Sequence, residues 1–359
     1  METLEDMMTA AQEEITRAEV EWEPRGRPPL LKTYIMESNN GQAKIEETDT
    51  VRFKQTPTDL PEVSILRLEY EGRRANFYLD ATDKRFLVLY TNDLAEVTDK
   101  LYHRLVQSTT NKFDKVWLPT EVLSEISKIS GNIFRGFGLR FTDRFSPEQA
   151  EEPINELSMT FAGTSSEEAL DALSERETLR RSISYSMIKV RRGNSQGFVT
   201  NEIRFNGRLI TKSGDSIDDH VSHVEMVRKI YKDLIEEIER NSIGTKKVGD
   251  RTLIEGQAFD LVLDRQIEDL DQFTDRLLRP NPFRLWGLRN KVFKNMRQVV
   301  AVDLHTGDPI DLEIAPSFIR IYLPRGACGN TVLRLYVNLQ HAFDSAIRFN
   351  GEKTPKVAN

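Results

Sequence analysis

The chain has 359 residues and a net charge of −7, a length that suggests two domains. Its single cysteine, Cys328, excludes an intramolecular disulfide and a cysteine-rich zinc site. The N-terminus is acidic and no run reaches eighteen apolar residues, so we expect neither a secretory signal nor a membrane-spanning helix. These features predict a cytoplasmic protein.

The first half of the chain opens with a helical pattern at residues 3–21, which the proline-rich segment 23–29 ends. Strand patterns follow, and a helix pattern runs to about Gln107 after the N-cap sequence Thr91-Asn92-Asp93. A short strand and a short helix that ends at Gly131 come next. The expected strands and helix here are LKTYIME, VSILRLEY, ANFYLD with RFLVLY as a hairpin, KVWLP and TEVLSEISKIS.

Residues 143–156 lack periodicity and contain Ser146-Pro147, which indicates a domain boundary. We therefore expect an acidic helix at 1–23, an N-terminal α+β domain at 30–145 and a C-terminal α+β domain at 157–349.

The second half contains the strongest hairpin signal, because Asn206-Gly207 between two strand patterns favours a type I′ turn. An amphipathic helix follows to about Arg240, with apolar residues recurring every three or four positions from Ile217. The last segment, TVLRLYVNLQHAFDSAI, is expected to be a helix, with a strand as the alternative for its first half. The other elements predicted are strands at ELSMTFAG, SISYSMIKVRR and AFDLVLD, a helix at QIEDLDQFTDRLL, and a meander of QVVAVDL, DLEI and FIRIYLP.

Strand-turn-strand units followed by a helix recur at 75–107, 198–240 and 299–347. This order predicts an α+β fold of antiparallel sheets with helices covering one face. The absence of alternating βαβ units and of a glycine-rich first turn argues against a doubly wound nucleotide-binding fold.

Charge is segregated along the chain. Residues 1–23 carry eight acids and one base, whereas residues 276–297 carry seven bases and no acid. We expect the acidic segment to dock on a basic surface, either 276–297 or a partner, because opposite charges attract.

The basic segment 276–297 interleaves cations with aromatic rings, a composition that suits phosphates and unpaired bases. A second basic cluster lies in the strand region 176–212. The nucleic-acid-binding candidates are Arg276, Arg279, Arg284, Trp286, Arg289, Lys291, Phe293, Lys294 and Arg297 in the first segment, and Lys189, Arg191 and Arg192 in the second. The alternative for both is internal pairing with the acidic segments 1–23 and 145–175.

No motif specifies a reaction. Glycines before the last helix make a candidate phosphate loop of Arg325, Gly326, Gly329 and Asn330, with a simple tight turn as the alternative. His220 and His223 have the i, i+3 spacing of a metal pair, but we expect them to be exposed beside the apolar helix face and to bind no metal. Cys328 is expected to be a packing residue rather than a nucleophile.

The sequence therefore predicts a non-catalytic subunit of a larger cytoplasmic assembly that contacts nucleic acid, DNA or RNA, or docks a protein partner. It is expected to need no cofactor and to take part in a hetero-oligomer. The alternatives are an enzyme acting on nucleic acid with a degenerate site, and a pure protein–protein adaptor. A place in a prokaryotic antiviral defence system is a further suggestion that no residue supports.

Overall fold

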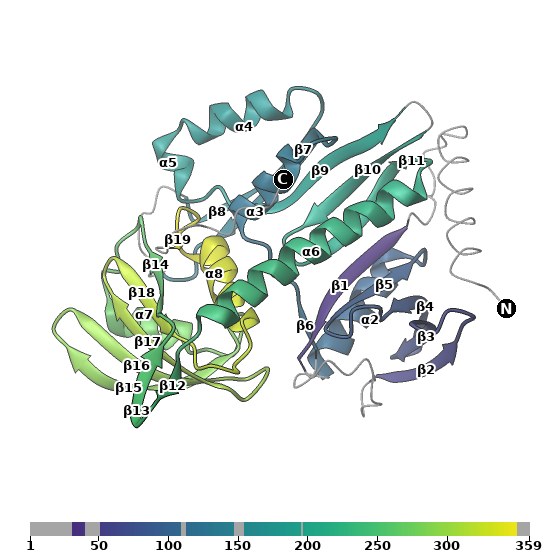
Figure 1. Cartoon of the computed structure of the whole chain (residues 1–359). Coiled ribbons are helices and arrows are strands. Elements are labelled where there is room, and N and C mark those ends of the chain that lie inside the picture. Colours follow the sequence, from purple (N-terminus) through teal and green to yellow (C-terminus); the bar gives the residue numbers. More distant parts are fainter. Residues whose placement is uncertain (1–30, 40–50, 109–112, 147–153, 195–196, 350–359) are drawn as a thin grey trace. The chain divides into compact units, whose positions relative to one another are not determined.

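The computed structural model describes residues 31–39, 51–108, 113–146, 154–194 and 197–349 (Figure 1). These residues form seven helices and nineteen strands in antiparallel sheets, which confirms the expected α+β class. The acidic segment 1–23 lies outside the described residues. The helices that the structure describes are all too short or too polar to span a lipid bilayer.

The chain forms two compact units, and each is built from segments that are not contiguous. Among the described residues, unit 1 combines those within Met1–Val116, Ile126–Arg135 and Met187–Lys229, and unit 2 combines those within Trp117–Glu125, Gly136–Ser186 and Ile230–Asn359. This division differs from the contiguous domains 30–145 and 157–349 that we expected. The reason is strand pairing, because β11 (Arg208–Gly214) lies antiparallel to β1 (Lys32–Ser38) and so joins residues 187–229 to the N-terminal strands.

Unit 1 contains one antiparallel sheet in the order β2-β3-β4-β5-β1-β11-β10-β9, with the short strand β6 also paired to β1. Its remaining elements are β2 (Arg52–Pro57), β3 (Val63–Tyr70), β4 (Arg73–Asp80), β5 (Phe86–Thr91), β6 (Phe113–Lys115), β9 (Tyr185–Asn194), β10 (Gly197–Arg204) and α2 (Ala95–Ser108). The hairpin-then-helix units predicted at 75–107 and 198–240 are thus confirmed.

Helices lie on both faces of this sheet, not on one as expected. Tyr34 of β1 points to α2, where its hydroxyl donates to Asp99 at 2.7 Å. The neighbouring Thr33 points the other way and contacts His220 of α6 (Ile217–Asn241) at 2.7 Å. Since successive residues of a strand face opposite sides, α2 and α6 cover different faces.

Two turns show how local sequence sets hairpin geometry. Gly207 has a φ of 73°, whereas the φ of Asn206 is not positive. The turn is therefore a three-residue loop that ends in a left-handed glycine, and not the expected type I′ turn, which needs two left-handed residues. Two consecutive left-handed residues, as type I′ requires, occur instead at Glu71 (φ 49°) and Gly72 (φ 74°) between β3 and β4.

Unit 2 contains a six-stranded antiparallel sheet in the order β15-β16-β17-β18-β14-β19. These strands are β14 (Phe259–Val262), β15 (Leu285–Phe293), β16 (Met296–Asp303), β17 (Pro309–Ala315), β18 (Phe318–Tyr322) and β19 (Arg348–Phe349). The predicted meander is β16-β17-β18, and α8 (Asn330–Ala342) confirms a closing helix throughout. Nearly every residue of α8 is buried.

Unit 2 also contains further strands and helices. They are β7 (Ile133–Thr142) paired with β8 (Glu156–Ala162), the isolated hairpin of β12 (Gly244–Val248) and β13 (Arg251–Glu255), and the helices α3 (Thr120–Lys128), α4 (Ser166–Ser174), α5 (Glu177–Arg180) and α7 (Leu270–Leu277). The sequence patterns missed α4, α5 and the β12–β13 hairpin.

Candidate interaction surfaces

The β15–β16 hairpin has one buried face and one exposed face. Residues directly opposite each other in an antiparallel pair share a face. On the inner face, where α7 contacts β16, Val299 and Ala301 are buried. On the outer face, Trp286 is 59% exposed, and Leu288 (67%) lies opposite Val300 (47%).

A bulge between Arg289 and Lys291 shifts the register by one residue. It places Lys291 opposite Gln298, and Phe293, which is 46% exposed, opposite Met296. The outer face of the edge strand β15 therefore presents Trp286, Leu288, Lys291 and Phe293 in one row. We call Trp286, Leu288, Phe293 and Val300 the outer patch.

A groove of about 400 Å³ lies beside this patch on the same side of the sheet. Its apolar lining includes Val300, Ile243 and Pro324, and its polar lining includes the carboxylates of Asp311 and Glu313. The groove therefore combines apolar walls with two acids.

Much of the positive charge in segment 276–297 is balanced by α7. Arg297 makes a bidentate pair with Asp271 at 2.9 Å from both Nε and Nη2, and Arg289 donates to the same carboxylate at 2.5 Å. These hydrogen bonds, from Arg297 first and then Arg289, hold the pKa of Asp271 well below its usual range. Arg276 instead donates to the backbone carbonyls of Arg144 and Ser146, each at 2.8 Å. Two of the seven cations thus have an internal partner, Asp271 of α7, which belongs to neither of the acidic segments 1–23 and 145–175.

The other four cations of the segment lie in two places, two in each. Arg279 and Arg284 lie between α7 and β15, where Arg284 has a left-handed φ of 55°. Lys291 and Lys294 lie at the end of the β15–β16 hairpin beside Phe293, and no acid among the described residues forms an ion pair with either. Residues 285–293 of the segment form β15, a strand that the sequence patterns missed.

The second basic cluster does not form a single surface. Arg191 lies 3.7 Å from the ring centre of Phe198, but Arg192 points to the opposite face of β9, because alternate residues of a strand face opposite ways. Burial is the main cause of the lowered pKa of His223, and the positive charge of Arg192 on this face lowers it further. Lys189 shares the face of Arg191 and lies opposite Glu202.

The candidate phosphate loop already holds carboxylates of the protein itself. The backbone N–H of Gly329 donates to Glu239 at 3.0 Å, and that of Cys328 donates to Asp308 at 3.2 Å. Arg325 pairs with Glu255 at 3.0 Å, and the amide of Asn330 donates to Tyr231 at 2.8 Å. These contacts favour a structural turn, and we leave Arg325, Gly326, Gly329 and Asn330 out of the proposed interface.

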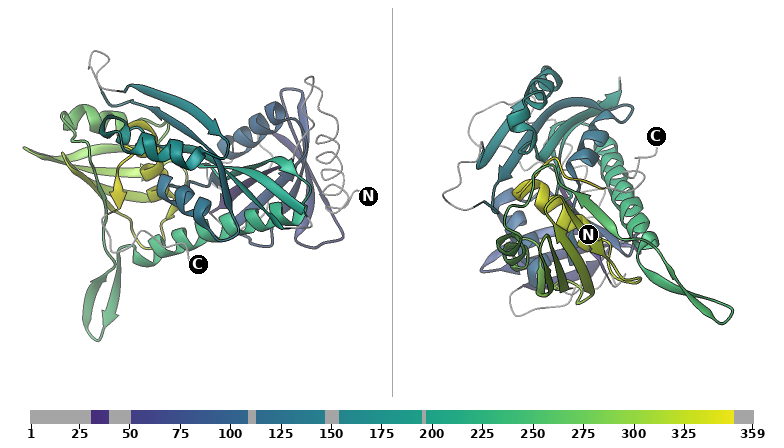
Figure 2. Two further views of the ribbon diagram at one scale, coloured as in Figure 1. Left: turned by 90° about the horizontal axis from the view of Figure 1, so that it is seen from above. Right: turned by 90° about the vertical axis from the view of Figure 1, so that its left-hand side faces the viewer.

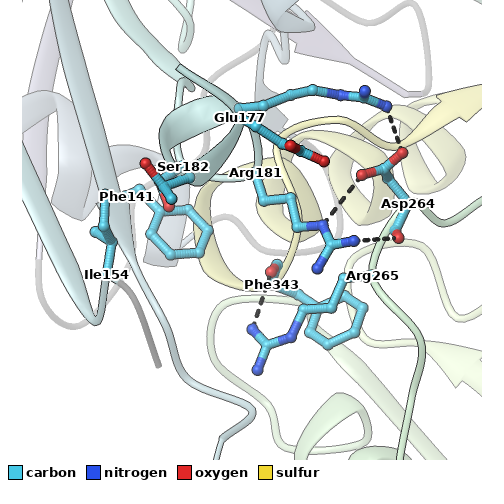
Figure 3. A pocket seen from close by; sticks show the side chains of 10 residues that line it. Phe141, Ile154, Glu177, Arg181, Ser182, Asp264, Arg265 and Phe343 are labelled. Carbon is cyan, nitrogen blue, oxygen red and sulfur yellow. Dashed lines mark hydrogen bonds and ion pairs between the residues drawn. The ribbon is translucent and has the colours of Figure 1, made fainter. Parts of the chain in front are cut away.

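An arginine-lined pocket of about 230 Å³ was not found by sequence reasoning (Figure 3). Arg180 and Arg181 converge on Asp264, and Arg265 lies over the ring of Phe343 and pairs with Asp143 at 2.7 Å. Each guanidinium thus has a carboxylate partner within unit 2. The contacting residues named here lie 78 or more positions apart in the sequence, so no local pattern could reveal the pocket.

His220 and His223 are fully buried, which corrects our expectation that they are exposed. Asn201 joins them: its amide nitrogen donates to Nδ1 of His223 at 2.8 Å, and its oxygen accepts from Nδ1 of His220 at 2.9 Å. Thr33 donates to Nε2 of His220, and Nε2 of His223 donates to Asn132 at 2.9 Å. The orientation of the Asn201 amide therefore sets the proton on Nδ1 of His220 and on Nε2 of His223.

Burial lowers the pKa of His220 to about 3 and that of His223 to about 4, so both rings are neutral. No group of three His, Cys, Asp or Glu side chains is placed to hold a metal ion within the described ranges. The two histidines therefore form a structural network of unit 1.

Asp303, the last residue of β16, belongs to a buried ion pair. The side chains of Arg334 and Asp303 are 0% and 1% exposed, and Nη2 of Arg334 donates to Asp303 at 2.5 Å. The backbone N–H of His305 and the hydroxyl of Thr331 donate to the same carboxylate. Cys328 is buried and is not part of a disulfide, as expected for a packing residue.

The whole chain matches one protein family. The model of the MJECL33-like protein family covers residues 1–357. The chain belongs to this family. It is 31% identical over 366 residues to the uncharacterized protein MJECL33 of Methanocaldococcus jannaschii, an alignment that covers 90% of this chain and 87% of that protein. The α+β architecture of two interleaved units is therefore the fold that this member of the MJECL33-like family adopts.

Proposed function

We propose that this MJECL33-like protein is a non-catalytic component of a larger assembly and docks a protein partner through the outer patch of unit 2. The supporting observation is the exposure of Trp286, Leu288 and Val300 on one face of the β15–β16 hairpin. Contiguous apolar side chains on an open sheet face are typical of interaction sites. Tryptophan in particular often anchors protein interfaces. A cytoplasmic location is part of this proposal, and a single buried cysteine without a disulfide is compatible with a reducing compartment.

A photo-crosslinking amino acid placed at position 288 should form a discrete adduct in cells of the native host. The reason is that Leu288 is 67% exposed at the centre of the outer patch. The matched control is the same amino acid at Glu168, an exposed position on α4 of the same unit. Denaturing gel electrophoresis and mass spectrometry of the adducts would measure the result. Equal crosslinking at positions 288 and 168 would contradict the docking surface.

Nucleic-acid contact is the second candidate, and the turn of the same hairpin favours it. Lys291 and Lys294 flank the exposed ring of Phe293, and none of the described acids neutralises them. A phosphate can meet each ammonium group while a base stacks on the ring. Because Arg289 and Arg297 are held by Asp271, fewer cations are available than the sequence alone suggested.

Replacing Lys291 and Lys294 with glutamine should therefore make single-strand binding less salt-dependent. Two phosphate contacts contribute a slope of about −1.4 in log affinity against log salt on a single strand, and removal of the Phe293 ring should cost about 1–3 kcal/mol of binding free energy. Fluorescence anisotropy with labelled DNA and RNA oligonucleotides would measure both effects. The control Arg289→Gln should leave the slope unchanged, since Asp271 already occupies that guanidinium. A wild-type protein that binds no oligonucleotide at low salt would eliminate this candidate.

A further inference from the structure

The β12–β13 hairpin is an arm without a partner in its own sheet. Its strands pair only with each other among the described strands, and Gly249-Asp250 makes the turn. Figure 2 shows it standing away from the other strands of unit 2 in both views. Val248, Leu253 and Ile254 are 51%, 49% and 80% exposed. An isolated two-stranded hairpin with exposed apolar residues is only marginally stable in water, which indicates that something covers it.

The two faces of the arm differ in composition. The register places Lys246 opposite Leu253 and Val248 opposite Arg251, so these four residues share one face. Lys247 and Ile254 lie on the other face. The first face therefore combines two apolar side chains with the cations of Lys246 and Arg251. Lys246 is already paired with Glu255 at the base of the arm, at 3.5 Å, so the exposed Arg251 is the cation available to a partner.

This face complements the groove on the outer side of the six-stranded sheet. The groove offers apolar contacts from Val300, Ile243 and Pro324 together with the carboxylates of Asp311 and Glu313. Glu313 already accepts hydrogen bonds from Gln298 and Tyr322, so the exposed Asp311 is the carboxylate available to Arg251 of the arm. Apolar side chains are available on both sides. Charge complementarity of this kind sets register and selects partners.

The position of the groove indicates which molecule supplies the arm. Ile243 lines the groove and is the residue directly before β12, and its bridge to Pro324 ties the base of the arm to the body of unit 2. The arm extends away from this base, so it reaches the groove of another molecule rather than its own. When each of two copies carries both an arm and a groove, a two-fold axis makes both contacts equivalent and closes the assembly.

We propose that two copies of this chain exchange β12–β13 arms, each arm lying in the groove of the other copy. The inference rests on the proposed function, because it identifies the docked partner as a second copy. The wild-type protein is then a dimer at micromolar concentration.

Two charge-reversed variants test the exchange. The arm variant carries Lys246→Glu and Arg251→Glu, and the groove variant carries Asp311→Lys and Glu313→Lys. Each alone places like charges at both contacts, so its self-association should weaken about 100-fold or more. An equimolar mixture should form a heterodimer, because the acidic arm meets the basic groove and the basic arm meets the acidic groove. Lys247→Glu, on the opposite face of the arm, is the matched control and should remain a dimer.

Sedimentation velocity and multi-angle light scattering would measure the masses, and circular dichroism would show that each variant is folded. Monomeric wild type at all concentrations, an arm variant that still dimerises, or a mixture that stays monomeric overturns the arm exchange. An arm that binds oligonucleotides while the chain remains monomeric overturns it as well. If position 288 nevertheless crosslinks to a different protein, the partner-docking proposal stands and only the identity of the partner is wrong.

Discussion

Replacing Arg334 with methionine should lower the free energy of unfolding of unit 2 by about 3–5 kcal/mol, the usual cost of leaving one member of a buried ion pair alone. Asp303 would then be a charged group with 1% of its side chain exposed. Burial opposes its ionisation, but the charge of Arg334 and the hydrogen bonds around the carboxylate hold its pKa below the usual range. Chemical denaturation followed by tryptophan fluorescence would measure the loss.

The double variant Arg334→Met with Asp303→Leu should recover part of this loss, because an apolar pair of similar volume often replaces a buried ion pair at little cost. Lys232→Met is the matched control, since its contact with Glu236 is long (4.0 Å) and both side chains are about half exposed. An exposed pair of this kind contributes at most about 1 kcal/mol. A single variant Arg334→Met as stable as the wild type would show that the pair does not support the sheet and α8.

Unit 1 should lose stability as the pH falls from about 7 toward 4.5, because His220 and His223 are neutral in the folded protein. Their folded pKa values, about 3 and about 4, lie below the ordinary value of 6.5. The unfolded chain therefore binds two more protons in this window, and stability rises with pH. The loss by pH 4.5 is about 2.5 kcal/mol for each histidine, and it continues down to the folded pKa values.

Urea denaturation at several pH values would test this dependence. The double variant His220→Gln and His223→Gln should bind about two fewer protons on unfolding between pH 6 and 4.5. His103→Gln is the control, because His103 is an exposed histidine of the same unit that contacts Lys115. Equal pH dependence in the wild type and the double variant would mean that the buried network is protonated in the folded state.

The sequence by itself determined the elements whose patterns are local. The apolar period from Ile217 onward predicted α6, and alternation around a glycine turn predicted β10 and β11. The strands of the meander and the closing helix α8 were found in the same way. Side-chain period and turn chemistry report secondary structure because both arise between residues close in the chain.

Only the tertiary structure decided which of these elements meet. The pairing of Lys32 with Ile210 joins segments that the sequence assigned to different domains. Burial of His220 depends on Thr33 and Asn201, which lie on two other elements. A helix pattern shows which residues lie near the apolar face, but it does not show which polar residues find partners across a sheet.

The candidate interface was likewise found in part from the sequence and in part only from the tertiary structure. Composition drew attention to segment 276–297, and Trp286, Lys291, Phe293 and Lys294 are indeed exposed or unpaired with the described acids. The tertiary structure removed Arg289 and Arg297 from this set, because α7 brings Asp271 against the inner side of the hairpin. It also added the groove, whose residues come from strands separated in sequence. A cluster of charges can be read from the sequence, whereas the charge of a surface depends on which opposite charges the fold brings next to that cluster.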